Sequence, residues 1–189
     1  MNTDGSHFKV DPEKLTADAK FVYKGDKYRI TVLSERLVRL EYNPTGKFID
    51  NATELVHNRK FPSITIKTEQ DNNFIVITTK YFTLEYAKEK SFKGSAFSPD
   101  SNLKVVLNNT DKIWYFGHPE ARNFGGSATS IEKDGMLTKL SKGLYSVDGF
   151  ATLDDSNSML LDDDGFLIEN KEKRIDIYLF AYRRDFGLC

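Results

Sequence analysis

The sequence predicts an all-β protein, an antiparallel β-sandwich made of many short strands. Phe, Tyr, Val, Ile and Thr gather in short runs separated by Gly, Asp and Asn, which is the composition of strands and turns. Within these runs apolar and polar residues alternate with the period of two that a half-buried strand requires. No segment carries a sustained helical period with caps. Short strands at fairly even spacing favour a sandwich or a barrel.

The expected strands follow one another along the whole chain. Hairpins are expected across residues 24–26, 71–73 and 164–165, where turn-forming residues separate two apolar runs. In residues 37–42 we expect Leu and Tyr to share one face, with Val, Arg and Glu on the other. Residues 82–86 alternate most strictly. The expected strands are 21–23, 28–33, 37–42, 64–67, 74–78, 82–86, 103–107, 113–116, 149–153, 159–161, 166–168 and 174–182.

The length of the chain favours one domain. It has 189 residues, and no internal repeat or linker divides it. We expect residues 1–20 to form a flexible leader with one helical turn near Pro12, and residues 21–189 to form a single β-sandwich domain. The last residues, 183–189, follow a strong strand and end on an apolar residue and a thiol. We therefore expect the chain to continue into a further element.

Composition and charge exclude several classes of protein. Apolar residues make up 39% and aromatic residues 13% of the chain, which is enough for a core and argues against disorder. The net charge is −1 and no basic block occurs, so a nucleic-acid partner is not expected. No apolar run is long enough to span a membrane, and no signal peptide is present. The single cysteine, Cys189, has no partner in the chain and predicts a reducing compartment. We expect a cytoplasmic protein of bacterial origin.

No complete catalytic set is present in the sequence. The three histidines, His7, His57 and His118, have no metal-ligand spacing, so neither a metal nor a cofactor is expected, and exposed loop histidines are predicted. No phosphate-binding loop or nucleophile elbow occurs. The acidic run 162–164 is typical of a hairpin turn. Glycoside hydrolysis needs two carboxyl groups at a defined separation, and no pair is assigned.

A few residues between positions 122 and 155 are candidates for sugar binding. Asp148, Asp154 and Asp155 bracket the expected strand 149–153, and each could either contact a sugar or hold its own loop in place. Tyr145 is the best candidate for stacking on a sugar, whereas Trp114 and Phe116 lie in an expected strand and favour core packing. Arg122 could bind a ligand or form a structural ion pair. These alternatives stay open.

Six stretches of the chain form a recognisable ordered set. They are Arg36-Leu37-Val38-Arg39-Leu40-Glu41-Tyr42, Tyr115-Phe116-Gly117, Arg122-Asn123-Phe124-Gly125-Gly126, residues 143–151, Leu153-Asp154-Asp155-Ser156 and residues 176–186. In this order they resemble the N-terminal domain of glycoside hydrolase family 31. The resemblance covers most of the chain, and the ordered set is more specific than any one stretch. Val147 departs from the family, which often has a polar residue at the matching position.

The resemblance implies a fold and a function. The fold is a galactose-mutarotase-like β-sandwich, which in the family precedes a catalytic (β/α)8 barrel. Family members are retaining α-glycosidases whose two catalytic carboxylates lie in the barrel. The resemblance therefore implies that this chain contains no catalytic residue. The sandwich lends a loop to the substrate pocket. Asp148 matches the residue of that loop that contacts substrate hydroxyls, and Asp154 and Asp155 match a segment beside it.

The implied partners are an α-glucoside oligosaccharide and the barrel itself. A surface that normally contacts the barrel would be apolar and exposed in this chain, and it could join two copies as a homodimer. Two alternatives remain: a free-standing carbohydrate-binding module, and a mutarotase-like epimerase that uses His118 with an unspecified glutamate.

Overall fold

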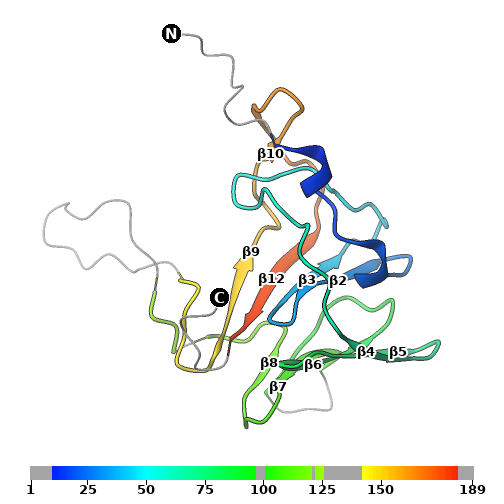
Figure 1. Cartoon of the computed structure of the whole chain (residues 1–189), viewed down its shortest axis with the longest axis vertical. Helices are drawn as coiled ribbons and strands as arrows, with labels where there is room; N and C mark the ends of the chain where they lie inside the picture. The colour runs from blue at the N-terminus through cyan, green and yellow to red at the C-terminus, as the bar shows by residue number, and fades with distance from the viewer. Residues whose placement is uncertain (1–9, 97–100, 121, 126–141, 183–189) are drawn as a thin grey trace, which may run out of the picture.

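The computed structural model describes residues 10–96, 101–120, 122–125 and 142–182. Two 3-10 turns, η2 (Pro12–Lys14) and η3 (Ala19–Phe21), precede the first strand (Figure 1). The carbonyl groups of Lys14 and Leu15 accept hydrogen bonds from Arg59, at 2.6 and 3.3 Å. Among the described residues no helix is both long and apolar enough to cross a membrane. Residues 1–9, including His7, and residues 183–189, including Cys189, lie outside the described part of the chain.

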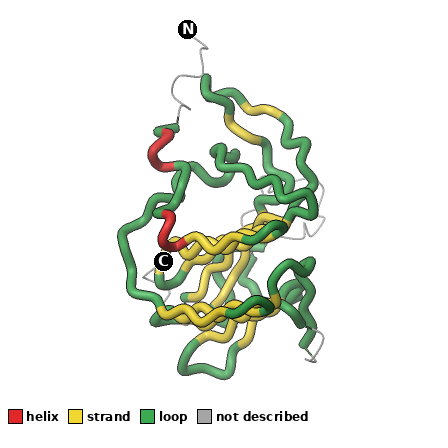
Figure 2. The backbone as a smooth tube through the Cα atoms, turned by 90° about the vertical axis from the view of Figure 1, so that its right-hand side faces the viewer, coloured by secondary structure: helices red, strands yellow, loops and turns green. Residues whose placement is uncertain are grey.

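The described strands form two five-stranded antiparallel sheets and a small hairpin. Figure 2 shows the two layers of strands and the loops that cover the outer side of one of them. Sheet 1 has the order β1 (Val22–Lys24), β2 (Tyr28–Ser34), β3 (Leu37–Tyr42), β12 (Ile175–Ala181) and β9 (Phe150–Asp154). Sheet 2 is a meander of β4 (Lys67–Gln70), β5 (Phe74–Thr78), β6 (Phe82–Ala87), β7 (Leu103–Leu107) and β8 (Ile113–Tyr115). The hairpin joins β10 (Leu160–Leu161) to β11 (Leu167–Ile168).

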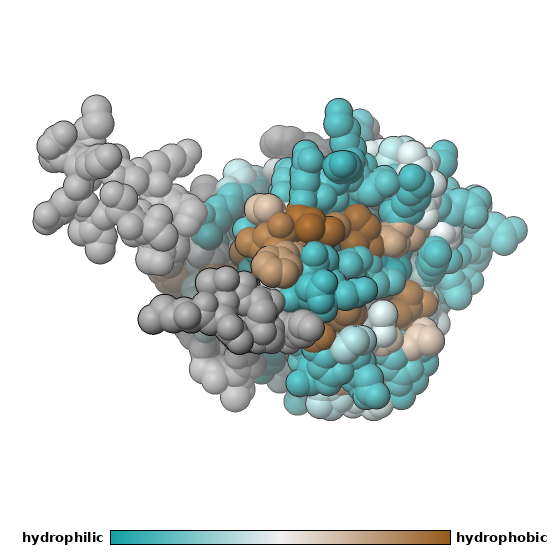
Figure 3. All heavy atoms as spheres, turned by 90° about the horizontal axis from the view of Figure 1, so that it is seen from above, coloured by the Kyte–Doolittle hydropathy of each residue, from teal (hydrophilic) through white to brown (hydrophobic). Residues whose placement is uncertain are grey.

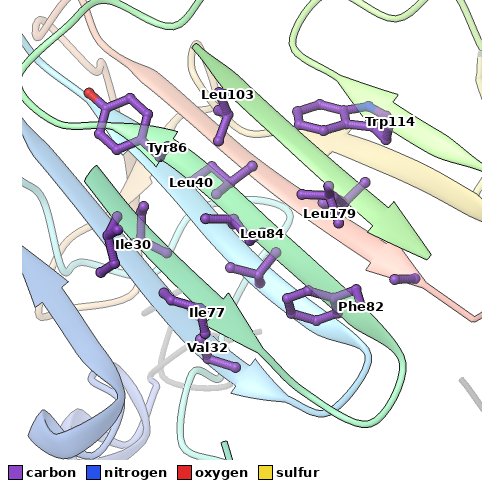
Figure 4. Close-up of a cluster of buried hydrophobic side chains, with 14 of the residues drawn as sticks. Ile30, Val32, Leu40, Ile77, Phe82, Leu84, Tyr86, Leu103, Trp114 and Leu179 are labelled. Carbon is purple, nitrogen blue, oxygen red and sulfur yellow. The ribbon is translucent and has the colours of Figure 1, made fainter. Parts of the chain in front are cut away.

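The core lies between the two sheets. Leu40 and Leu179 of sheet 1 meet Leu84 and Phe82 of sheet 2, and all four side chains are 0% exposed (Figure 4). Alternate residues of each strand point into this layer, as they must when two sheets pack face to face. The predicted antiparallel β-sandwich is therefore confirmed.

Most of the predicted strands and turns are confirmed, with two corrections. The second hairpin begins its first strand at Lys67 rather than at Ile64, although Ile64 and Ile66 still pack against the core. The faces of β3 were predicted wrongly. Val38 shares the inner face with Leu40, because side chains on a strand alternate strictly, and both are fully buried.

The outer face of sheet 1 carries a buried cluster of charged side chains. Arg39 binds Asp176 of the neighbouring strand β12 with two hydrogen bonds of 2.9 and 2.6 Å. Arg29 of β2 binds Glu41 in the same bidentate manner, at 2.6 and 2.8 Å. Arg39 also lies 3.1 Å from Glu41, which links the two pairs. Arg174 adds a contact of 3.2 Å to Asp176. One charged network therefore ties three adjacent strands together.

Loops bury this network on its outer side. The carbonyl of Ile49 accepts hydrogen bonds from both Arg29 and Arg39, at 3.3 and 3.1 Å. Burial alone would raise the pKa of Asp176, but the hydrogen bonds and charge of Arg39 and the charge of Arg174 outweigh it and hold that pKa below its usual range. The Asp176 carboxylate is therefore kept charged inside the protein by its arginine partners.

Removal of the Asp176 carboxylate is expected to destabilise the fold strongly. The variant Asp176→Ala removes the carboxylate that pairs with both Arg39 and Arg174 while these arginines stay buried, and breaking a buried pair in this way costs about 3–5 kcal/mol. The matched control is Glu69→Ala, which breaks a 2.6 Å ion pair between exposed side chains and should leave stability nearly unchanged. Urea unfolding followed by circular dichroism measures both. Equal midpoints for the two variants would contradict the role of the network.

Candidate functional site

The candidate site is built on the connection between the two sheets. β8 is an edge strand of sheet 2 and β9 is an edge strand of sheet 1, and the segment between them links the two sheets. Its described residues are 116–120, 122–125 and 142–149. Its two arms are joined by a bridge between Asn123 and Ser146. The amide of Asn123 also donates to the carbonyl of Gly143 at 2.7 Å. These bonds fix the base of the connection, which positions the side chains on either arm.

Two of the predicted residues meet at this base. Arg122 Nη1 lies 3.2 Å from Asp148 Oδ1, and Lys112 Nζ lies 3.9 Å from the same oxygen. The Asp148 side chain is 12% exposed, whereas that of Arg122 is 52% exposed. Asp148 also lines a cavity of about 360 Å³, here called the Asp148 cavity, together with Lys104 and Lys112. The arrangement holds a carboxylate at the wall of a cavity, within reach of a polar ligand.

His118 lies between this cavity and a second one, and it lines both. The prediction of an exposed loop histidine is wrong for this residue, which is half-buried. Its ring lies 4.8 Å from Tyr115 and meets Phe150 edge-on at 5.0 Å. Nδ1 accepts a hydrogen bond of 3.0 Å from the backbone N–H of Glu120, so the neutral ring carries its proton on Nε2. Burial lowers the pKa of His118, against the opposing charges of Glu120 and Asp148.

Glu120 is a candidate that the sequence did not indicate, because it lies in a glycine-rich stretch without periodicity. Its side chain is buried and accepts hydrogen bonds from the hydroxyl and the N–H of Thr152 in β9. Lys142 Nζ lies 3.8 Å from its carboxylate. Glu120 lines the second cavity, of about 450 Å³ and here called the Glu120 cavity, between the edge strands β8 and β9.

The predicted residues Asp154 and Asp155 have opposite environments. Asp154 is exposed, lines the Glu120 cavity and accepts hydrogen bonds from the N–H and hydroxyl of Ser156, at 3.0 and 2.5 Å. Asp155 is 0% exposed and accepts hydrogen bonds of 2.8 and 3.1 Å from the Thr53 hydroxyl. That hydroxyl oxygen accepts in turn from the N–H of Val56 at 3.0 Å. Burial raises the pKa of Asp155. Asp155 therefore holds the loop around Thr53 and faces no solvent.

Tyr145 lies on the same arm as Asp148 but faces elsewhere. Its side chain is exposed, and its ring packs against Tyr182 with 5.6 Å between ring centroids. The Tyr145 carbonyl accepts a hydrogen bond of 2.9 Å from Phe124, a second exposed aromatic residue. Trp114, in contrast, is buried in the core as predicted, with 2% of its surface exposed. The structure thus brings Arg122 and Asp148 together and places Asp154, Asp155 and Tyr145 apart from them.

Comparison with known proteins adds no further identification. No family model matches the chain, and no curated protein matches it. Within the described ranges no group of three or more His, Cys, Asp and Glu side chains is placed to hold a metal ion. The chemistry of the two cavities therefore has to be argued from their own carboxylates, their amino groups and His118.

The pKa of His118 is expected to report directly on the two cavities. We expect a value below the usual 6.5, and the variant Asp148→Asn should lower it further because a carboxylate that favours the imidazolium is lost. Lys142→Gln should raise it, because a neighbouring positive charge is removed. An NMR titration of the histidine ring signals measures all three values. Shifts of the same sign in both variants would contradict the arrangement described for His118.

Truncation of Asp155 is expected to loosen the loop around Thr53. Asp155→Ala leaves a buried hydroxyl without its acceptor, which costs about 1–3 kcal/mol. Asp155→Asn keeps an oxygen that can accept from Thr53 and should lose clearly less. Unfolding midpoints measure the free energies, and amide exchange at Val56 measures the local effect. Fast exchange at Val56 in the alanine variant but not in the asparagine variant is the expected pattern, and no difference between the two variants would count against it.

Proposed function

We propose that this chain is the non-catalytic N-terminal β-sandwich, of galactose-mutarotase-like type, of a retaining α-glucosidase-type glycoside hydrolase. In this proposal it packs on a catalytic (β/α)8 barrel and lends the connection between β8 and β9 to the substrate pocket. The observation that carries the proposal is the position of Asp148, which is held by Arg122 at the base of that connection, at the wall of a cavity. The ordered stretches that resemble glycoside hydrolase family 31 support it.

The geometry of Asp148 suits a contact with sugar hydroxyl groups. Among the described residues, its ion-pair contacts with Arg122 and Lys112 both involve Oδ1. We expect the second oxygen, Oδ2, to accept a hydrogen bond from a hydroxyl of the substrate. A hydrogen bond to a charged group contributes about 1.5–3 kcal/mol, which is large enough to position a sugar ring.

The placement of the carboxylates argues against catalysis by these residues alone. Hydrolysis of a glycoside needs two carboxyl groups about 5–9.5 Å apart that face one ligand. Among the described residues Asp148 and Glu120 line different cavities, and Glu120 is already engaged by Thr152. The proposal therefore places both catalytic carboxylates in the barrel and expects the 189-residue chain to be inactive.

An exposed apolar surface supports docking against another domain. Leu167 and Ile168 of the β10–β11 hairpin are 48% and 42% exposed, and Phe166 beside them is 49% exposed. Leu55 lies next to this hairpin, because the N–H of Glu54 donates to the carbonyl of Met159. Figure 3 shows apolar side chains gathered on the end of the molecule that carries the hairpin in Figure 1. Contiguous exposed apolar surface marks an interaction site, and the proposal assigns it to the barrel or to a second copy.

A second candidate function is a free-standing carbohydrate-binding module. The exposed Tyr145 and Phe124 favour it, since aromatic side chains on a loop are the common platform for sugar rings. This candidate expects the 189-residue chain to bind maltose through Tyr145 and expects no hydrolysis by a longer chain.

The proposal is tested by hydrolysis of 4-nitrophenyl α-glucoside. The 189-residue chain should release no nitrophenol, whereas the protein translated from the continuing reading frame should turn the substrate over. In that longer protein Asp148→Asn should lower kcat/KM by roughly 10–150-fold, the equivalent of one lost charged hydrogen bond. The matched control Asp26→Asn changes an exposed carboxylate at the β1–β2 turn and should leave kcat/KM unchanged.

Two outcomes would overturn the proposal. One is turnover by the 189-residue chain at a rate comparable with the longer protein. The other is an Asp148→Asn variant of the longer protein with unchanged kinetics for every α-glucoside that it cleaves.

A further inference from the structure

The Glu120 cavity lies where the sandwich is open. It lies between β8, the edge of sheet 2, and β9, the edge of sheet 1, and it has a volume of about 450 Å³. Its apolar wall includes Phe116, Leu153 and Ile177. The polar side chains around it are Glu120, Lys142 and Asp154, with Thr152, His118 and Trp114. Ligand cavities are typically of about 300–1,000 Å³, so this one is large enough for a small molecule.

The inner face of β9 changes from apolar to polar at this cavity. Phe150, Thr152 and Asp154 alternate along the strand and therefore share one face. Thr152 and Asp154 pair with Leu179 and Ile177, which face the space between the sheets. Inner positions of a sandwich are ordinarily apolar, because they form the core. The polar residues at this end of β9 line a cavity in place of packed core.

The buried indole of Trp114 contributes an unpaired donor. Trp114 is 2% exposed, and Nε1 has no hydrogen-bond acceptor among the described residues. Figure 4 shows the ring with its nitrogen on the side turned away from Leu103. An unsatisfied buried N–H costs about 1–3 kcal/mol, so buried Trp N–H groups normally have an acceptor. A ligand oxygen in the cavity would supply one.

Glu120 is held in place in advance of any ligand. The hydroxyl and the N–H of Thr152 both donate to its carboxylate, and Lys142 lies 3.8 Å from it. Its backbone has a φ of 49°, in the left-handed region that a residue with a side chain rarely adopts. Such strain is maintained when the surroundings determine the conformation, and it is concentrated at functional sites.

The charges of the cavity indicate the class of ligand. Glu120 and Asp154 are acidic, Lys142 is basic, and burial favours the neutral ring of His118. Acidic groups therefore outnumber basic ones, which disfavours an anion. The carboxylates accept hydrogen bonds, whereas Trp114 Nε1 donates one, and the remaining wall is apolar. A neutral ring that carries several hydroxyl groups fits all three features.

We propose that the Glu120 cavity binds a single neutral sugar, a hexose, independently of the catalytic barrel. The indole N–H of Trp114 donates to one sugar oxygen, and the carboxylates of Glu120 and Asp154 accept hydrogen bonds from hydroxyl groups. Ile177 and Phe116 contact the C–H face of the ring. This site lies on the other side of His118 from the Asp148 cavity, and it requires neither Asp148 nor Tyr145.

The chain contains one tryptophan, which makes the site directly observable. In a ¹⁵N-labelled 189-residue chain the single indole N–H signal belongs to Trp114. Titration with D-glucose should move this signal downfield and reach saturation, because a hydrogen bond to the sugar forms. D-glucuronate has the same ring with a negative charge and should bind at least about 10-fold more weakly, the equivalent of 1.4 kcal/mol.

Variants locate the binding. Glu120→Gln should weaken D-glucose binding at least about 10-fold, since a charged acceptor is lost while the size of the side chain is kept. Asp148→Asn and Tyr145→Ala should leave the titration curve of the indole signal unchanged. The remaining amide signals of each variant report whether it is folded.

The proposal is overturned if D-glucose at about 0.1 M leaves the indole signal in place, a concentration at which a Kd of about 10 mM would give nearly full occupancy. It is also overturned if D-glucuronate binds as well as D-glucose, or if Tyr145→Ala abolishes the response, which would favour the carbohydrate-binding module. Hydrolysis by the longer protein is measured separately through Asp148, so either proposal can fail without the other.

Discussion

The pairing of Arg39 with Asp176 is the interaction on which the rest of the structure depends. It joins β3 to β12 through two hydrogen bonds inside the protein, between two residues that are 137 positions apart in the sequence. A bidentate guanidinium–carboxylate pair has strict geometry, so it fixes the register of the two strands as well as their distance. β12 in turn pairs with β9. The side chains of Phe150, Thr152 and Asp154 in β9 line the two cavities.

The two cavities share one residue, and this links their chemistry. His118 lies on the wall of both, with Asp148 on one side and Glu120 on the other. Its protonation responds to both carboxylates, because each favours the imidazolium form. A ligand that neutralises or displaces either charge therefore changes the proton affinity of the same ring.

The sequence predicts those parts of the fold in which one face of a strand is buried and the other exposed. β6 was predicted with its inner residues because Phe82, Leu84 and Tyr86 alternate with polar residues. β3 has both faces buried, and its charged residues are buried only because partners distant in the sequence neutralise them. Composition cannot distinguish such a face from a solvated one.

The same limit applies to the candidate site. Asp154 and Asp155 are neighbours in the sequence, yet Asp155 is buried because Thr53, 102 positions away, supplies its hydrogen bond. Arg122 and Asp148 could be chosen from the sequence, since both flank a glycine-rich connection. Glu120 could not, because its role depends on Thr152 across the opening of the sandwich.

The position of β12 in sheet 1 has a consequence for the synthesis of the protein. Sheet 2 is a meander, so each of its strands can pair as soon as the next one leaves the ribosome. In sheet 1 the last of the described strands, β12, lies between β3 and β9, and the sheet stays divided until residue 181 is available. Until then Arg39 lacks the carboxylate of Asp176, and β9 has no neighbouring strand. The nascent chain thus exposes an unpaired strand and half of the ion network. Because the strand order itself requires this, the topology makes sheet 1 fold late and makes the nascent chain need protection against aggregation.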